Sequence, residues 1–188
     1  MPGLAATRIS GYISSVPPRY RLSVAREQYK FSCAHMTVFP DGKKERLHGH
    51  NYTVAVSLEL TDVSFAKMIA FAPVKAQLAE LCAEWKERVF VATGNPHFEK
   101  LAVGTDTGVQ AGEYGFRLCG QRYILPAADV LELPVDNIAV EPLAAFICGR
   151  LRTRLADVLN APHVTAIETT VEESPGQGSS CWLPVHEA

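Results

Sequence analysis

The chain has 188 residues, of which 47% are hydrophobic and 20% charged, and its formal net charge is −2. This composition is typical of a globular domain with a substantial core, and it lacks the basic excess of a nucleic-acid-binding surface. No apolar run is long enough to cross a bilayer, and residues 1–8 lack the pattern of a signal peptide. We therefore expect a cytoplasmic protein that binds neither nucleic acid nor membrane.

The five cysteines are Cys33, Cys82, Cys119, Cys148 and Cys181. Their number is odd, and the chain has no C-x-x-C pair. Both features favour reduced thiols that are mostly buried as small apolar groups.

The first part of the chain predicts a short leader followed by two paired strands. Residues 1–20 contain glycine and proline but little periodicity, so we expect the folded domain to span residues 21–188. Apolar residues nearly alternate from Tyr20 to about Met36, which indicates a strand. Residues 39–44 contain the Pro, Asp and Gly of a turn. A second strand is then predicted through His48 to about Leu60, antiparallel to the first.

The remainder predicts two helices, a hairpin and further strands. Apolar residues at three- and four-residue spacing predict a helix over residues 73–89, with a possible extension through 90–92. Residues 114–118 and 121–125 indicate a hairpin. A second helix is predicted over about 140–158, with Asp136 or Asn137 as its N-cap.

A strand over 164–172 and a short one at 181–183 complete the pattern. The element order predicts an α+β domain, an antiparallel sheet with helices packed on one face. The other face of the sheet needs cover unless it is polar, and oligomerisation is one way to supply it.

A candidate metal site lies at the start of the second predicted strand. His48 and His50 are separated by one residue, so on a strand their side chains point to the same face. His35 lies in the preceding strand, and pairing of the two strands would bring three imidazoles together. Three protein ligands with an open fourth position are typical of catalytic zinc. Such histidines on strands are also found as ordinary surface or core residues.

These residues resemble those of the 6-pyruvoyl-tetrahydropterin synthase and 6-carboxy-tetrahydropterin synthase family. The similar segments are Phe31–His35, Leu47–Tyr52, Leu133–Pro134 with Asn137–Ala139, and Glu172–Pro175. Together they span about residues 29–184. The Leu-His-Gly-His-Asn-Tyr segment with the upstream Ala-His is the specific part of the resemblance.

The resemblance implies a tunnelling fold, in which four-stranded antiparallel sheets with two helices on one face assemble into an oligomeric barrel. It also implies Zn²⁺ bound by His35, His48 and His50, and a pterin-like small-molecule substrate anchored by Glu173. A homo-oligomer, trimer or hexamer, is the implied assembly.

The chain departs from the family pattern at the catalytic positions. Lys44 stands where the family has a catalytic cysteine, four residues before His48. Lys86 and Glu87 stand where the family has an aspartate and a histidine. Because some family members use a glutamate in place of the cysteine, Glu45 is a candidate for that role.

The remaining chemistry leaves several roles open. Glu45 or Glu87 could act as the acid–base group if burial or a like charge raises its pKa. Lys86 could balance one of these carboxylates, and Lys44 or Lys86 could form an imine with an aldehyde if desolvated. All four could equally be solvated charges without a catalytic role.

Two classes of function follow for the chain. One is a zinc-dependent carbon–oxygen lyase of the 6-pyruvoyl-tetrahydropterin synthase type, acting on a dihydroneopterin triphosphate-type or related carbonyl substrate with altered acid–base residues. The alternative is a non-catalytic pterin- or metal-binding homologue. An enzyme recruited to a biosynthetic pathway outside pterins is a further possibility.

Overall fold

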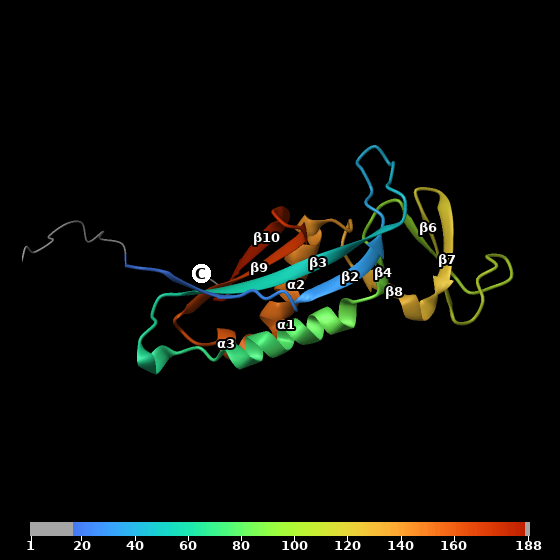
Figure 1. The fold of residues 1–188 in the computed structure, drawn as a ribbon. Coiled ribbons are helices and arrows are strands. Elements are labelled where there is room, and N and C mark those ends of the chain that lie inside the picture. The colour runs from blue at the N-terminus through green and yellow to red at the C-terminus, as the bar shows by residue number, and fades with distance from the viewer. Residues whose placement is uncertain (1–16, 187–188) are drawn as a thin grey trace, which may run out of the picture.

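A computed structural model describes residues 17–186 of the chain (Figure 1). Its main feature is a mixed sheet of seven strands. The strands are β1 (Tyr20–Val24), β2 (Lys30–His35), β3 (His48–Leu60), β4 (Arg88–Ala92), β8 (Val130–Leu133), β9 (Val164–Ser174) and β10 (Gln177–Pro184). Their order is β10-β9-β3-β2-β4-β8, and β1 pairs with the second half of β3. The pairs β2–β4 and β4–β8 are parallel, and the others are antiparallel.

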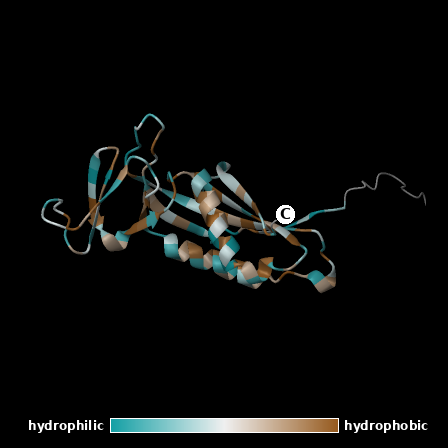
Figure 2. Cartoon of the chain, turned by 180° about the vertical axis from the view of Figure 1, so that it is seen from behind, coloured by the Kyte–Doolittle hydropathy of each residue, from teal (hydrophilic) through white to brown (hydrophobic). Residues whose placement is uncertain are grey.

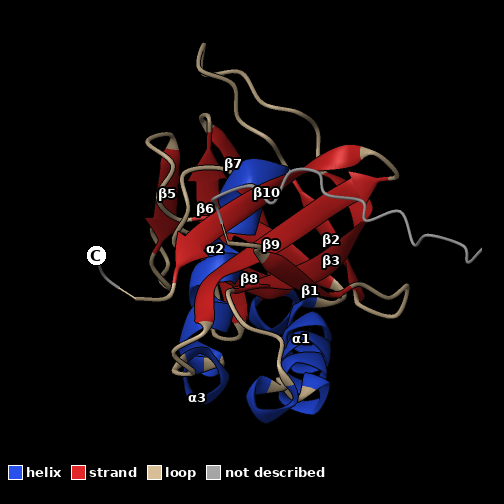
Figure 3. Cartoon of the chain, turned by 90° about the vertical axis from the view of Figure 1, so that its left-hand side faces the viewer, coloured by secondary structure: helices blue, strands red, loops and turns tan. Residues whose placement is uncertain are grey.

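The helices lie on one side of this sheet (Figure 3). They are α1 (Phe71–Trp85), α2 (Val140–Arg154) and the short α3 (Ala156–Leu159). Along β3, every second residue from Tyr52 to Leu60 is buried, while the residues between them are partly exposed. This alternation is what the period of a strand requires when one face is covered and the other is not.

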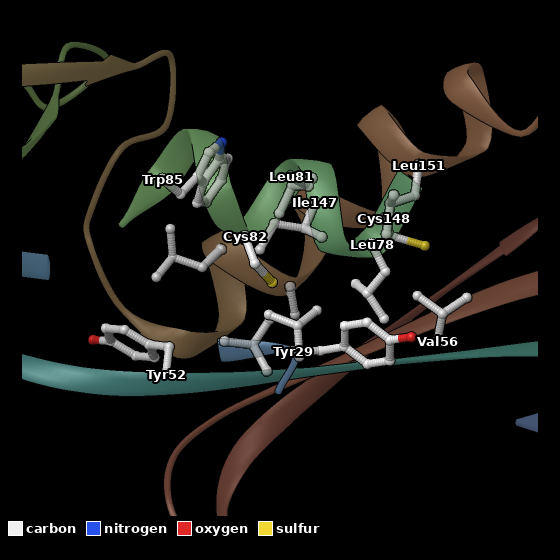
Figure 4. Packing of buried hydrophobic residues seen from close by; sticks show 14 of the residues in the cluster. Tyr29, Tyr52, Val56, Leu78, Leu81, Cys82, Trp85, Ile147, Cys148 and Leu151 are labelled. Atoms are coloured by element: carbon white, nitrogen blue, oxygen red, sulfur yellow. The ribbon is translucent and has the colours of Figure 1, made fainter. Parts of the chain in front are cut away.

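The main core lies between the helices and the sheet. Figure 4 shows Leu78, Leu81 and Trp85 of α1 facing Tyr52 and Val56 of the sheet. Apolar and polar residues alternate along the helices in Figure 2, as expected for elements with one buried face. The core therefore fixes the side of β3 that faces the helices, which is also the side of the two β3 histidines.

A second, smaller sheet lies beyond the end of the large one. It contains β5 (Phe98–Leu101), β6 (Glu113–Leu118) and β7 (Gln121–Pro126) in that order, all antiparallel. Its own apolar cluster includes Phe116 and Leu118 of β6 together with Met36 and Val38, which follow β2. The segment after His35 is thus packed against this second sheet.

Several predictions are confirmed by the structure, and others are wrong in extent. The α+β class is confirmed, as are the strand from His48 to Leu60 and the hairpin of β6 and β7. The predicted four-stranded sheet is too small, because β1 is a separate strand and the parallel strands β4 and β8 extend the sheet. The single strand predicted from Tyr20 to Met36 is broken by a turn in which the Tyr29 N–H donates to the Arg26 carbonyl at 3.0 Å.

The first helix ends earlier than predicted. Trp85 is its last residue, and Glu87 has a φ of 60°, so the proposed extension at 90–92 is strand β4 instead. The apolar run Val89–Val91 fits a strand with neighbours on both sides, which short apolar runs do not reveal by periodicity alone.

The start of the second helix also differs from the prediction. Ala139 is the N-cap of α2 and provides no side-chain cap. The Asn137 side chain, predicted as a cap, bonds instead to the backbone of Val38. The second predicted helix is divided into α2 and α3.

Most of the predicted leader, residues 1–16, lies outside the described residues. Within residues 17–186, no helix is both long enough and apolar enough to span a membrane.

Candidate metal centre

The three histidines converge where β2 ends and β3 begins. The antiparallel register places His35 opposite His48 and Cys33 opposite His50. His48 and His50 lie on the same face of β3 as Tyr52, which is fully buried beneath the helices. One ring nitrogen from each histidine lies within 4.8 Å of those of the other two, and the Nε2 atoms of His48 and His50 are 3.1 Å apart.

The state of these imidazoles fits a bound metal ion. His35 is only 2% exposed, and burial, followed by the like charges of His48 and His50, lowers its pKa to about 4. The Glu45 carboxylate and the Ile138 carbonyl beside the ring act in the opposite direction and are smaller effects. His35 is therefore neutral near pH 7, the form in which an imidazole binds a metal.

The contacts of the rings indicate which nitrogens are close enough to share one metal ion. His48 Nδ1 donates to the Arg46 carbonyl at 2.8 Å, so Nε2 is the nitrogen that the neutral ring would offer to a cation. The Tyr52 hydroxyl lies 3.2 Å from His35 Nε2. Three converging imidazoles with this carbonyl support are the donor set expected for zinc with an open position.

The histidines line one end of a cavity of about 230 Å³. Glu45 and Glu173 line it too, as do Thr37 and the residues at the start of α2, Ile138, Ala139, Val140 and Glu141. One oxygen of Glu45 is 3.8 Å from His48 Nε2, whereas Glu173 accepts a hydrogen bond of 2.6 Å from Gln177. The cavity therefore combines a possible metal site with a nearby carboxylate able to accept a proton.

Lys44 is directed away from the histidines. Its ammonium group donates to the Glu45 carbonyl at 3.2 Å and lies 5.2 Å from the centre of the Tyr123 ring. Cys33 is likewise unsuited to a role as a nucleophile, because burial raises the pKa of its thiol to about 12.

Lys86 and Glu87 lie at the junction of α1 and β4 and are both exposed. Glu87 lines a separate cavity of about 480 Å³, together with Asn51, Arg88 and Asp129. His50 borders both cavities. The structure thus brings Glu45 and Glu173 together with the three histidines, and places Glu87 and Lys86 elsewhere.

Thr37 and Glu141 also line the cavity, and neither was expected there from the sequence. Thr37 could have been found, because it continues the alternation from His35 by two residues. Glu141 had no distinguishing signal, since an acidic residue in the first turn of a helix is also favoured by the helix dipole.

Comparisons with known proteins agree with this fold. The chain is 22% identical to the 6-pyruvoyl tetrahydropterin synthase of Plasmodium vivax, with a TM-score of 0.78, covering 89% of this chain and 99% of that one. The Plasmodium falciparum enzyme gives the same identity and TM-score, with 88% and 98% covered. Two further P. vivax structures carry alanine or cysteine in place of a glutamate described as a catalytic residue.

Curated protein sequences provide no significant match. The model of the family described as 6-pyruvoyl tetrahydropterin synthase matches residues 24–183, which include both histidine segments and Glu173. The chain therefore belongs to the 6-pyruvoyl tetrahydropterin synthase family.

Proposed function

We propose that the chain is a zinc-dependent lyase of the 6-pyruvoyl-tetrahydropterin synthase type, acting on a dihydroneopterin triphosphate-type substrate. The observation that carries this proposal is the position of Glu45, whose carboxylate lies 3.8 Å from a histidine of the metal cluster in the cavity that Glu173 also lines. The catalytic glutamate of the P. vivax relatives gives independent support for a carboxylate in this role.

The histidines and two of the carboxylates that line the cavity each have a chemical task in this proposal. His35, His48 and His50 would bind the zinc ion, which supplies a positive charge that polarises an oxygen on the substrate side chain. Glu173 accepts hydrogen bonds from the donor edge of the pterin ring and thereby orients the side chain toward the histidines.

Glu45 then acts as the base. Its carboxylate takes a proton from the carbon next to the polarised group, and the electron pair of the broken C–H bond forms a carbon–carbon double bond. The neighbouring C–O bond breaks and the oxygen leaves with its electrons, which is the overall change of a carbon–oxygen lyase.

Glu45→Gln tests this assignment because it removes the base and keeps the size of the side chain. The variant should bind zinc and pterin as the wild type does but convert dihydroneopterin triphosphate about 100-fold more slowly, as judged by mass spectrometry of the products. Glu80→Gln, which makes the same change on an exposed position of α1, is the matched control and should keep the wild-type rate.

Other outcomes of the same experiment separate the alternatives. Wild-type turnover by Glu45→Gln would contradict the role of Glu45. Binding of the pterin by the wild type without conversion would favour the non-catalytic homologue, and zinc binding without pterin binding would favour an enzyme outside pterin pathways.

The catalytic roles of Glu87 and Lys86 stay predictions that two further variants test. Because Glu87 lines a different cavity from Glu45, we expect Glu87→Gln and Lys86→Ala to retain turnover within about three-fold if Glu45 is the principal base. A loss as large as that of Glu45→Gln would instead assign the acid–base role to the residues at the α1–β4 junction.

A further inference from the structure

The cavity at the histidines has two walls that come from distant parts of the chain. The first wall begins at the last residue of β2 and contributes His35, Thr37 and Glu45. The second wall is the start of α2, from Ile138 to Glu141. The distance between these walls decides how much space a ligand has beside Glu45 and the histidines.

The side chain of Asn137 joins the two walls. Its Oδ1 accepts hydrogen bonds from the backbone N–H of Val38 at 3.0 Å and of Ile138 at 3.1 Å. Its Nδ2 donates to the Val38 carbonyl at 2.9 Å. The amide therefore satisfies both backbone groups of Val38, as a neighbouring strand would, and only a side chain with both a donor and an acceptor can do this.

Further contacts extend this connection into the cavity. Thr37, next to Val38, accepts a hydrogen bond of 2.9 Å from the N–H of Glu45 through its carbonyl. Its hydroxyl donates to the Ile138 carbonyl at 3.4 Å. The same carbonyl faces the ring of His35, where it acts to raise the pKa of that imidazole. A metal-binding histidine commonly donates its second ring N–H to such a carbonyl.

The opposite side of the first wall is fixed by apolar packing. Met36 and Val38 are buried against Phe116 and Leu118 of the second sheet. The segment is thus held by the second sheet on one side and by Asn137 on the other. Loss of the Asn137 bonds would release the side that faces the second wall of the cavity.

We propose that Asn137 is a positioning residue that sets the separation of the two cavity walls, and with it the placement of Glu45 and His35 relative to the rest of the metal site. This inference rests on the metal site of the proposed function. It assigns Asn137 no contact with substrate, and it gives the second sheet a role as a support for the wall that carries Glu45.

Asn137→Asp provides the sharpest test. Aspartate has nearly the same shape as asparagine, keeps the acceptor, and replaces the donor by a negatively charged oxygen beside the Val38 carbonyl. Asn95→Asp is the matched control, because the Asn95 amide donates to the Asp136 carbonyl at 2.6 Å and accepts from the His97 N–H at 2.9 Å. It therefore joins neighbouring loops in the same way, but its bonds reach Asp136 and His97 and not Val38 of the first wall.

The measurement is the binding of Co²⁺, a spectroscopic substitute for zinc, together with the visible absorption spectrum of the bound ion. We expect Asn137→Asp to bind Co²⁺ about ten-fold more weakly and to change its spectrum, as changes behind metal ligands commonly do. Asn95→Asp should bind within about two-fold of the wild type, with the same spectrum. If Asn137→Asp does not fold, the neutral Asn137→Ser is judged by the same criteria.

The possible failures are distinguishable. Wild-type Co²⁺ affinity and spectrum in the Asn137 variant would overturn the positioning role and leave the proposed function standing. Equal weakening by both asparagine variants would also overturn it, because the effect would then follow from general destabilisation. Failure of the wild type itself to bind Co²⁺ would overturn the metal site and this inference with it.

Discussion

His35 owes its suitability as a metal ligand to its surroundings. The ring lies under the start of α2 and beside two other histidines, so burial and like charge both disfavour its protonated form. Its Nδ1 atom has no hydrogen bond of normal geometry among residues 17–186. An unprotonated and poorly solvated imidazole binds a metal readily but is costly to protonate.

This cost predicts a pH dependence of folding in the metal-free protein. The pKa of His35 falls from 6.5 to about 4 on folding, so the unfolded chain binds more protons between these values. Protonation of His35 therefore leaves the free energy of unfolding unchanged above about pH 6.5. As the pH falls from 6.5 toward 4, it lowers the free energy of unfolding by up to about 3 kcal/mol. Urea unfolding at pH 7.5, 6 and 5 measures this decrease.

A substitution of His35 shows how much of this pH dependence of stability comes from its ring. His35→Gln should lose less free energy of unfolding between pH 7.5 and 5 than the wild type, whereas His97→Gln, at an exposed loop position, should behave as the wild type does. Parallel pH dependences of the wild type and His35→Gln would show that the ring is not held neutral by the fold.

The pairing of β2 with β3 determines how the three imidazoles are arranged. Gly49 separates His48 from His50 and lies opposite Ala34 of β2. A Cβ at this position would lie 3.1 Å from the Cys33 carbonyl oxygen, which is closer than ordinary contact. A larger residue between the two histidines therefore requires the Cys33 backbone to shift by a few tenths of an ångström.

We predict that Gly49→Ala weakens zinc binding and lowers the free energy of unfolding by about 1 kcal/mol, because β2 and β3 must move apart near the histidines. Gly149→Ala in α2 is the matched control, since a Cβ there meets nothing within 4 Å. It should leave zinc binding unchanged and stabilise the helix by up to about 1 kcal/mol. A competition titration with a chromophoric chelator compares the zinc affinities, and wild-type affinity in Gly49→Ala would contradict the prediction.

The same elements show what the sequence could predict. Strand β3 could be predicted, because apolar residues alternate with small or polar ones along it, and this period places both histidines on one face. Strand β4 was not, because an apolar run directly after a helix fits either type of element until its neighbours are known. The positions of Glu87 and Lys86 depend on that junction, so their separation from the histidines could not be predicted either.

The position of the second cavity wall could not be predicted from the sequence either. Its closeness to Glu45 depends on hydrogen bonds between Asn137 and Val38, residues that are far apart in the chain. Asparagine before a helix normally suggests a cap, and only the tertiary structure shows that its side chain bonds elsewhere.

For the whole molecule, the main feature is the sheet face that the helices leave uncovered. Its residues on β3, from Thr53 to Glu59, are partly exposed and mostly small or polar, and Trp182 of β10 is exposed. A mostly polar face of an antiparallel sheet can lie against water, so this face does not by itself require a partner. The predicted trimer or hexamer follows instead from the family resemblance, and in such an assembly this face is the place where we expect further copies of the chain to pack.

The oligomer prediction is tested by the molar mass in solution. We expect sedimentation equilibrium to give three or six times the 20.5 kDa of one chain, and Ala55→Lys on the uncovered face to lower that mass. Thr153→Lys, on the exposed side of α2, is the control and should not change it. A monomeric wild type at micromolar concentration would contradict the prediction.

The central claim is that His35, His48 and His50 hold one zinc ion, and the zinc content of purified protein tests it most directly. We expect about one zinc per chain in the wild type and in His97→Ala, and none in a folded His48→Ala variant. A wild type without zinc after incubation with the metal, or a His48→Ala variant that retains one zinc per chain, would contradict it.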